Sequence, residues 1–258
     1  MLRSIYNSRS GIAIYERSLA RTAHNLANVN TIAYKRSEVL PGDTSYHSLQ
    51  DRRFSHTSET RLPIGQGVHL QAATPFMGQG VLIETGRPLD LAISGEGYFR
   101  IISAVDGTTY YTRNGHFQLD GTGSVVTATG DYLDVPFKLT AETGLLSITP
   151  EGVVVNNLSG GKVEELGQIK LYRITNPIGL SGDGDGRYLE SALSGEAEEG
   201  LPGAAGFGSI RQHYLEQSNT DTALEMVQLL LAQRALQANV RCLITADELQ
   251  ALILQVKT

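Results

Sequence analysis

Both ends of the chain carry helical apolar periodicity over long stretches, whereas the sequence between them does not. In the first 36 residues, apolar side chains recur seven positions apart, at Ile5, Ile12, Leu19 and Leu26. This spacing places them on one face of an α-helix. Residues 221–258 form a second long amphipathic segment. Helices at both extremities, flanking a glycine-rich middle, predict a chain organised for assembly with other subunits.

The N-terminal helix has one good apolar stripe and one poor one. The second set of heptad positions holds Ser8, Tyr15, Thr22 and Val29, so an isolated two-stranded coiled coil would be marginal. We expect the helix, from Leu2 to about Val29, to dock against several neighbours at once. Asparagines collect where it should end, because asparagine tolerates the left-handed backbone of a helix terminus.

The C-terminal helix is expected to begin near Asp221, with Glu225 in its first turn at the positive end of the helix dipole. Its apolar residues cover two stripes, which is more than one short partner helix could bury. Left exposed, such a surface promotes aggregation, so we expect a multi-helix assembly to cover it. The residues expected to pack between subunits are Ile5, Ile12, Leu19, Leu26, Met226, Leu229, Leu236, Val240 and Leu243.

The middle of the chain is predicted to be β-structure with an extended arm. From about Val81 to Ile210 apolar residues alternate, and Asn-Gly and Asp-Gly pairs are typical of hairpin turns. The glycine-rich residues 194–208 are expected to be a loop. The expected fold class is α+β, with N- and C-terminal helices paired as a coiled-coil-like stalk around an inserted, mainly antiparallel β domain. The expected parts are an N-terminal helix at 1–36, an arm at 37–80, a β-rich domain at 81–210 and a C-terminal helix at 211–258.

Charge is unevenly distributed along the chain. The formal net charge is −6, yet residues 1–36 hold six Arg or Lys residues against Glu16 alone, a local charge of +5. A basic helix could bind nucleic acid or an anionic membrane surface. A solvated face, or one that meets acidic groups in an assembly, fits better because the remaining chain is acidic. We expect such neighbours to meet Arg3, Arg9, Arg17 and Arg21.

No constellation of side chains indicates an enzyme. The six histidines are scattered without ligand spacing, so neither a metal nor a cofactor site is expected. Residues 183–186, Asp-Gly-Asp-Gly, lack the ligands of a calcium loop and are interpreted as a hairpin turn. Cys242, the single cysteine, permits no intramolecular disulfide and is expected to be a small buried hydrophobe. Residues 1–30 lack the apolar core of a secretory signal, and no apolar run approaches the roughly 20 residues of a membrane span.

Three motifs resemble one known family. Residues 24–36 read H-N-L-A-N-V-N-T-I-A-Y-K-R, which is similar to the N-terminal signature of bacterial flagellar rod and hook proteins. Residues 218–248 resemble the C-terminal helix of that family, and residues 90–99 and 111–117 resemble its β domain. The resemblance spans the whole chain. The matching signature positions are Asn25, Leu26, Ala27, Asn28, Thr31, Tyr34 and Lys35.

One position departs from the signature. Ala33 stands where the family usually has glycine. If the backbone there needs a positive φ, alanine is disfavoured by about 1 kcal/mol or more. Either this strain is present, or the local turn differs from the usual one of the family.

The resemblance implies a structural subunit of the flagellar rod, the drive shaft, which polymerises helically through its terminal helices around the export channel. Chain length and the segment 64–68 (Ile-Gly-Gln-Gly-Val) favour a distal-rod member. A proximal-rod paralogue, a secreted β-domain binding module and a hydrolase with its site in the β domain are the alternatives.

The family also implies partners and a location. The partners would be further copies of the chain, other flagellar rod and hook proteins, the bushing ring proteins and the flagellar type III export apparatus. Neither nucleic acid nor a small-molecule substrate is expected. The location would be the basal body, in the rod that crosses the periplasm, reached without a cleavable signal peptide.

Overall fold

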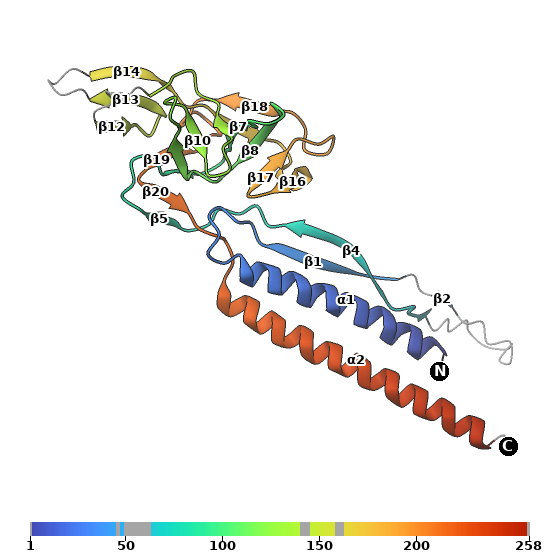
Figure 1. The fold of residues 1–258 in the computed structure, drawn as a ribbon. Helices are drawn as coiled ribbons and strands as arrows, with labels where there is room; N and C mark the ends of the chain where they lie inside the picture. The colour runs from blue at the N-terminus through green and yellow to red at the C-terminus, as the bar shows by residue number, and fades with distance from the viewer. Residues whose placement is uncertain (1, 45–46, 49–62, 140–144, 158–162, 257–258) are drawn as a thin grey trace. The chain divides into compact units, whose positions relative to one another are not determined.

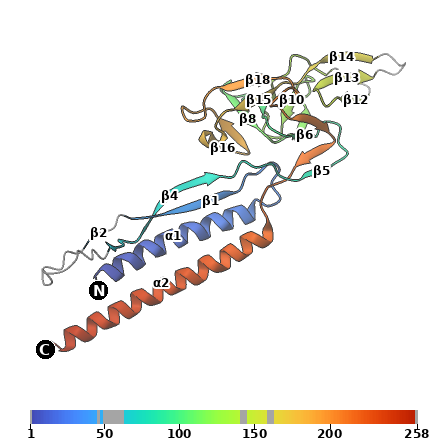
Figure 2. The ribbon, with the colours of Figure 1, turned by 180° about the vertical axis from the view of Figure 1, so that it is seen from behind.

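The computed structural model describes residues 2–44, 47–48, 63–139, 145–157 and 163–256. The chain forms two compact units (Figures 1 and 2). The helical unit comprises residues 1–27, 37–75 and 221–258, and the β unit comprises residues 28–36 and 76–220. The expected α+β class is confirmed: two long helices in mutual contact accompany a mainly antiparallel β region.

The helical unit contains the two predicted helices and a two-stranded ribbon. Helices α1 (Leu2–Ala27) and α2 (Thr222–Val256) lie side by side and run in opposite directions (Figure 1). Strand β1 (Ser37–Asp43) pairs antiparallel with β4 (Val68–Pro75), and both contact α1. The short strands β2 (His47–Ser48) and β3 (Pro63–Ile64) pair with each other. The described part of the expected arm is therefore a hairpin-like ribbon up to Pro75, and residues 76–80 belong to the β unit. Residues 45–46 and 49–62 of that arm lie outside the described residues.

Helix α2 begins where its cap predicts. The Asp221 side chain accepts hydrogen bonds from the backbone N–H groups of Ala223 (2.8 Å) and Leu224 (3.3 Å). These are first-turn donors without a partner inside the helix, so the carboxylate is an N-cap. The C-terminal segment expected at 211–258 is thus helical only from Thr222, because residues 209–212 and 214–216 are strands of the β unit.

The seam between α1 and α2 is made of small and polar side chains. On α1, Ser8, Thr22 and Asn25 are buried. A Cβ on Gly11 would lie 2.8 Å from the Asn239 side-chain oxygen, so the helices approach closely there. The second, more polar set of heptad positions includes Ser8 and Thr22. This set, and not the apolar one, faces the partner helix of the same chain. The apolar positions Ile5, Ile12, Leu19 and Leu26 are half-buried.

The β unit is built around a seven-stranded antiparallel sheet in the order β16-β17-β8-β7-β11-β10-β9. Two- and three-stranded pairings surround it: β12-β13-β14, β15-β18, β19-β6 and β20-β5. The strands are β5 (Leu82–Glu84), β6 (Leu91–Ser94), β7 (Phe99–Ile102), β8 (Thr109–Thr112), β9 (Phe117–Leu119), β10 (Val125–Thr127), β11 (Tyr132–Leu133), β12 (Leu145–Ile148), β13 (Val153–Asn157), β14 (Val163–Gln168), β15 (Leu171–Ile174), β16 (Ser181–Gly184), β17 (Arg187–Leu189), β18 (Ala197–Gly200), β19 (Ser209–Gln212) and β20 (Tyr214–Glu216). A short 3-10 helix, η1, spans Pro177–Gly179.

Its core is apolar and aromatic. Phe99 and Phe117 are fully buried and meet edge to face, with ring centroids 5.4 Å apart. Inward-facing aliphatic residues of several strands surround them, as alternation along a half-buried strand requires. A second cluster gathers Tyr98, Tyr111 and Tyr172. These two clusters give the β unit a hydrophobic core of its own.

The hairpin predictions have mixed outcomes. The Asp-Gly pairs at 106–107 and 120–121 connect paired strands, and residues 183–186 connect β16 and β17, as expected. The Asn-Gly pair at 114–115 does not close a hairpin, because β8 and β9 are not neighbours in the sheet. Its Gly115 instead lies against β6, where a Cβ would meet the Leu91 carbonyl oxygen at 1.6 Å.

One further β prediction is wrong. The expected loop at 194–208 contains β18, which pairs with β15 although β16 and β17 lie between them in the sequence. β14 ends at Gln168 and pairs with β13, whereas β15 begins at Leu171 and has β18 as its partner. No helix among the described residues is long and apolar enough to cross a membrane.

Candidate functional site: the helix pair and a polar clasp

Asn25 joins three elements of the helical unit. Its side-chain oxygen accepts a hydrogen bond from the Ser37 backbone N–H (3.1 Å), and its amide nitrogen donates to the Ser37 carbonyl (2.9 Å). The same amide also donates to the Glu225 carboxylate at 3.2 Å. All three residues are buried. This signature asparagine therefore ties the last turn of α1 to the start of β1 and to the first turn of α2.

Among the other signature residues, Leu26 and Ala27 end α1, whereas Asn28, Thr31, Tyr34 and Lys35 lie in the β unit after α1. The Thr31 backbone N–H donates to the Asn28 carbonyl (3.1 Å), and the Thr31 hydroxyl donates to the Asn28 side chain (3.1 Å). Leu26 is half-buried and Ala27 is the exposed last residue of α1. The Tyr34 carbonyl accepts a hydrogen bond from the Asn219 backbone at 3.3 Å.

Asn219 holds two separate segments of the β unit together. Its side-chain oxygen accepts from the Arg36 N–H (2.8 Å), and its amide donates to the carbonyls of Phe76 (2.7 Å) and Gly78 (2.9 Å). The chain passes between the units at 27–28, 36–37, 75–76 and 220–221. Asn219 thus connects the β-unit ends of three of these four crossings. Amide side chains suit this role because each offers both a donor pair and an acceptor.

Glu216 lies at the centre of a buried ion network in the same region. Its carboxylate pairs with Lys35, accepts from the Gly80 N–H (2.8 Å) and lies 3.4 Å from an Arg113 guanidinium nitrogen. Burial lowers the pKa of Lys35, and the Glu216 carboxylate partly opposes that shift. Burial also raises the pKa of Tyr98, whose ring lies under the Arg113 guanidinium. We call Ala33, Lys35, Arg113, Glu216 and Asn219 the clasp.

Ala33 adopts the backbone that the glycine of the signature would favour. Its φ is 56°, and it is 1% exposed. Its N–H donates to the Glu216 carbonyl at 2.8 Å. The positive φ considered from the sequence is therefore present. The hydrogen bond to Glu216 and the burial of the methyl group stabilise Ala33 in this conformation.

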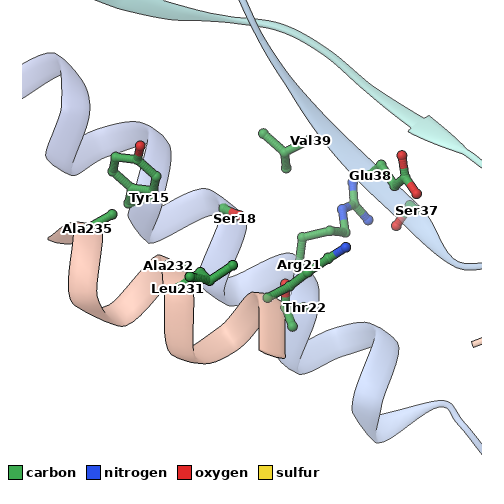
Figure 3. Close-up of a pocket in the computed structure, with 11 residues that line it drawn as sticks. Tyr15, Ser18, Arg21, Thr22, Ser37, Glu38, Val39, Leu231, Ala232 and Ala235 are labelled. Carbon is green, nitrogen blue, oxygen red and sulfur yellow. The ribbon is translucent and has the colours of Figure 1, made fainter. Parts of the chain in front are cut away.

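A groove of about 480 Å³ lies within the helical unit, between α1, the first half of α2 and β1. Figure 3 shows Tyr15 and Ser18 from α1, Val39 from β1, and Leu231 and Ala235 from α2 around it. Leu231 is 61% exposed. Arg21, Glu38 and Gln228 add polar groups to its lining. Apolar and polar side chains therefore both line the groove.

The expected packing residues differ in exposure within the single chain. Leu229, Leu236, Val240 and Leu243 are half-buried, whereas Met226 is 51% exposed. The structure of one chain does not test their role between subunits. Cys242 is exposed, so the expectation of a buried thiol is wrong. It lies on a side of α2 that α1 does not cover.

Among the described residues, no group of three His, Cys, Asp or Glu side chains could hold a metal ion. Glu216 and Glu225 were not identified as site residues from the sequence, apart from the expected dipole contact of Glu225. Their isolated carboxylates carry no local signature. Only their proximity to the signature asparagines and lysine in space makes them part of the site.

The chain matches known proteins along nearly its full length. A family model described as the flagellar hook protein FlgE/F/G D1 domain matches residues 92–156, and one described as the flagellar basal body rod FlgEFG protein C-terminal region matches residues 211–256. The flagellar basal-body rod protein FlgG of Borreliella burgdorferi is 34% identical over 96% of both chains. FlgG of Caulobacter vibrioides is 33% identical, and FlgG of Bacillus subtilis is 34% identical, each covering 96% of this chain and 97% of the relative.

The likeness to the hook protein is narrower. FlgE of Borreliella burgdorferi is 36% identical over 43% of this chain and 25% of its own length. Full-length similarity to FlgG therefore separates this chain from hook proteins and confirms the expectation of a distal-rod member, with a structural role in motility and no enzymatic one. The chain belongs to the flagellar basal-body rod and hook family, within which it is an FlgG-like protein of the distal rod.

Proposed function

We propose that this rod protein polymerises by burying the apolar faces of its two terminal helices against neighbouring copies. The observation that carries the proposal is the surface of α2. Ten of its apolar side chains are 49–62% exposed in the single chain. Each such leucine that becomes buried contributes about 1 kcal/mol. These residues are Leu224, Met226, Val227, Leu230, Leu231, Ile244, Leu249, Leu252, Ile253 and Leu254.

The geometry of such contacts produces a filament. The small-residue seam between α1 and α2 is used within the chain, so different faces of the helices remain for neighbours. Contacts between unlike surfaces do not close into a ring unless a rotation brings them back to the start. The half-buried Leu236, Val240 and Leu243, with Ile5, Ile12, Leu19 and Leu26, complete this surface. The polymer surrounds the export channel with its helices.

Charge contributes to the same contacts. Arg9 and Arg17 are exposed, and no described carboxylate forms an ion pair with Arg9, Arg17 or Arg21. Acidic groups of neighbouring subunits pair with them in the rod. Reversing two of these charges should weaken assembly and change its salt dependence. Unchanged assembly at every salt concentration would exclude the pairing.

The proposed partners follow from the family. Other rod and hook proteins share the terminal helices and extend the same packing above and below this protein. The type III export apparatus delivers the chain, and the bushing ring proteins surround the assembled rod. The contact that holds the polymer together is still the one between the helical units of neighbouring copies.

Complementation tests the proposal. In a strain that lacks the gene, the chain with Leu230→Asp or Leu236→Asp should give basal bodies with truncated rods and no hooks in electron micrographs. The matched control is Gln237→Asp, which introduces the same charge on the same helix at an exposed polar position. It should restore complete rods. Circular dichroism and urea unfolding of each purified variant should show a folded β unit. Complete rods from the Leu230→Asp chain would refute the proposal.

A further inference from the structure

The far end of α2 carries a compact apolar strip. Leu249, Leu252 and Ile253 are spaced i, i+3 and i+4, so they share one face of the helix. They are 52%, 56% and 52% exposed. Glu248, also exposed, is the acidic residue at the edge of this strip. We call these four residues the C-terminal strip.

The groove of Figure 3 has the complementary character. Tyr15, Val39 and Leu231 present apolar surface, and the charged residues Arg21 and Glu38 also line the groove. Arg21 forms no ion pair with any described carboxylate, and the groove offers about 480 Å³. An aliphatic helix face with one acidic flank offers apolar side chains to the groove and a carboxylate to Arg21.

The strip and the groove of one chain cannot meet. Leu231 in the groove and Leu252 in the strip are 21 positions apart on the same unbroken helix. At 1.5 Å per residue they are separated by about 32 Å. Any contact between strip and groove therefore joins two copies, displaced along the helix direction by about that distance.

We propose that the C-terminal strip of one copy occupies the groove of the next, with Glu248 paired to Arg21 across the interface. This inference rests on the proposed function and specifies which surfaces make the subunit contact. The contact is head to tail, and each copy offers both halves, so it propagates without closing. A different flagellar protein in the groove is the competing occupant.

Disulfide cross-linking of assembled rods tests the contact. The background is Cys242→Ser, which removes the only cysteine. Leu231→Cys and Leu252→Cys are then introduced singly and together, both at exposed positions. A disulfide needs Cα atoms within about 7 Å, so it reports direct proximity. Basal bodies are isolated from a strain that lacks the native gene, oxidised and run on a non-reducing gel.

The double-cysteine chain should give a ladder of dimers, trimers and longer products. Each single-cysteine chain should remain monomeric, and the two co-expressed single-cysteine chains should give dimers only. The control pair, Gln237→Cys with Leu252→Cys, should give no ladder because Gln237 lies outside the groove. Complete rods without a ladder, or cross-links from the double-cysteine chain only to another protein, would overturn the inference and leave the proposed function intact.

Charge reversal tests the ion pair independently. Arg21→Glu and Glu248→Arg should each reduce the number of complete rods at least several-fold, and the two together should restore most of it. If the double reversal is no better than the single ones, the pairing of Glu248 with Arg21 is wrong.

Discussion

The substitution Glu216→Gln isolates the contribution of the buried charge in the clasp. Glutamine keeps the size of the side chain and its ability to accept a hydrogen bond from Gly80. Among the described residues, it removes the one carboxylate that pairs with Lys35 and Arg113, whose side chains are 1% and 7% exposed. The variant therefore contains two buried cations without their counter-charge.

The expected loss of stability is large. Removing one member of a buried ion pair costs about 3–5 kcal/mol, because the remaining charge stays buried without compensation. Lys35 would respond by losing its proton more readily, since burial already lowers its pKa from the ordinary 10.5 and Glu216 opposes that shift. Between the lowered pKa and 10.5 the unfolded chain binds more protons than the folded one. Stability of the variant should therefore rise as the pH rises through that window.

Urea unfolding followed by circular dichroism measures the effect. The matched control is Glu198→Gln in the same unit, where the carboxylate pairs with Arg173 at 2.6 Å but the two side chains are 57% and 39% exposed. That change should cost less than about 1 kcal/mol. Similar losses for the two variants would refute the reasoning. A Lys35→Met, Glu216→Gln double variant should lose less than the sum of the single losses, because the two residues contact each other.

Three shorter predictions concern other parts of the chain. Burial raises the pKa of Tyr188 to about 12, so the neutral phenol stabilises the fold fully below pH 10 and this contribution is lost between pH 10 and about 12. In unfolding measured as a function of pH, Tyr188→Phe should reduce the loss of stability across that interval. Asp221→Ala removes the N-cap of α2 and should lower the stability of the helix by about 1 kcal/mol, seen as reduced helical circular dichroism on heating. In limited proteolysis of the dilute monomer, both terminal helices should be cleaved before the β unit, and a protease-resistant C-terminal helix would contradict this order.

The helices were predictable because their periodicity is local and long. Leu2 and Thr222 lie within a residue of the expected starts. The face used inside the chain was not predictable from hydrophobicity, because Ser8, Gly11 and Thr22 pack by closeness and not by apolar area. The importance of their small size becomes apparent only when the partner helix packs against them.

The β unit shows the same limit. Strand existence follows from alternation, but pairing depends on residues far apart in sequence. The Asn-Gly pair at 114–115 has the composition of a hairpin turn, yet it serves a close backbone approach to Leu91. β18 was missed because its central residues, Glu198 and Glu199, are both exposed, so the strand carries no alternating apolar pattern.

The contacts of the signature residues, in the helical unit and in the clasp, were predictable in part. The signature indicated Asn25 and Lys35, but not that one contacts Glu225 and the other Glu216. Both acidic partners lie about 200 residues away, at 200 and 181 positions. A sequence pattern identifies the signature residues. Their contacts with the two glutamates form only after the two ends of the chain have come together.

Ala33 gives the last test, because opposing terms nearly cancel there. Releasing a non-glycine residue from a φ of 56° gains about 1–2 kcal/mol. Against this, glycine loses about 0.5–1 kcal/mol of backbone entropy, and removing a buried methyl group loses about 0.8 kcal/mol. Ala33→Gly should therefore change stability by less than about 1 kcal/mol in urea unfolding, which explains how alanine replaces the usual glycine. Ala33→Thr should cost at least about 3 kcal/mol, since a β-branched residue adds strain and volume where the side chain is 1% exposed. A gain of about 2 kcal/mol or more for Ala33→Gly would exceed what relief of this strain can supply once the entropy of glycine is counted, and would refute this balance.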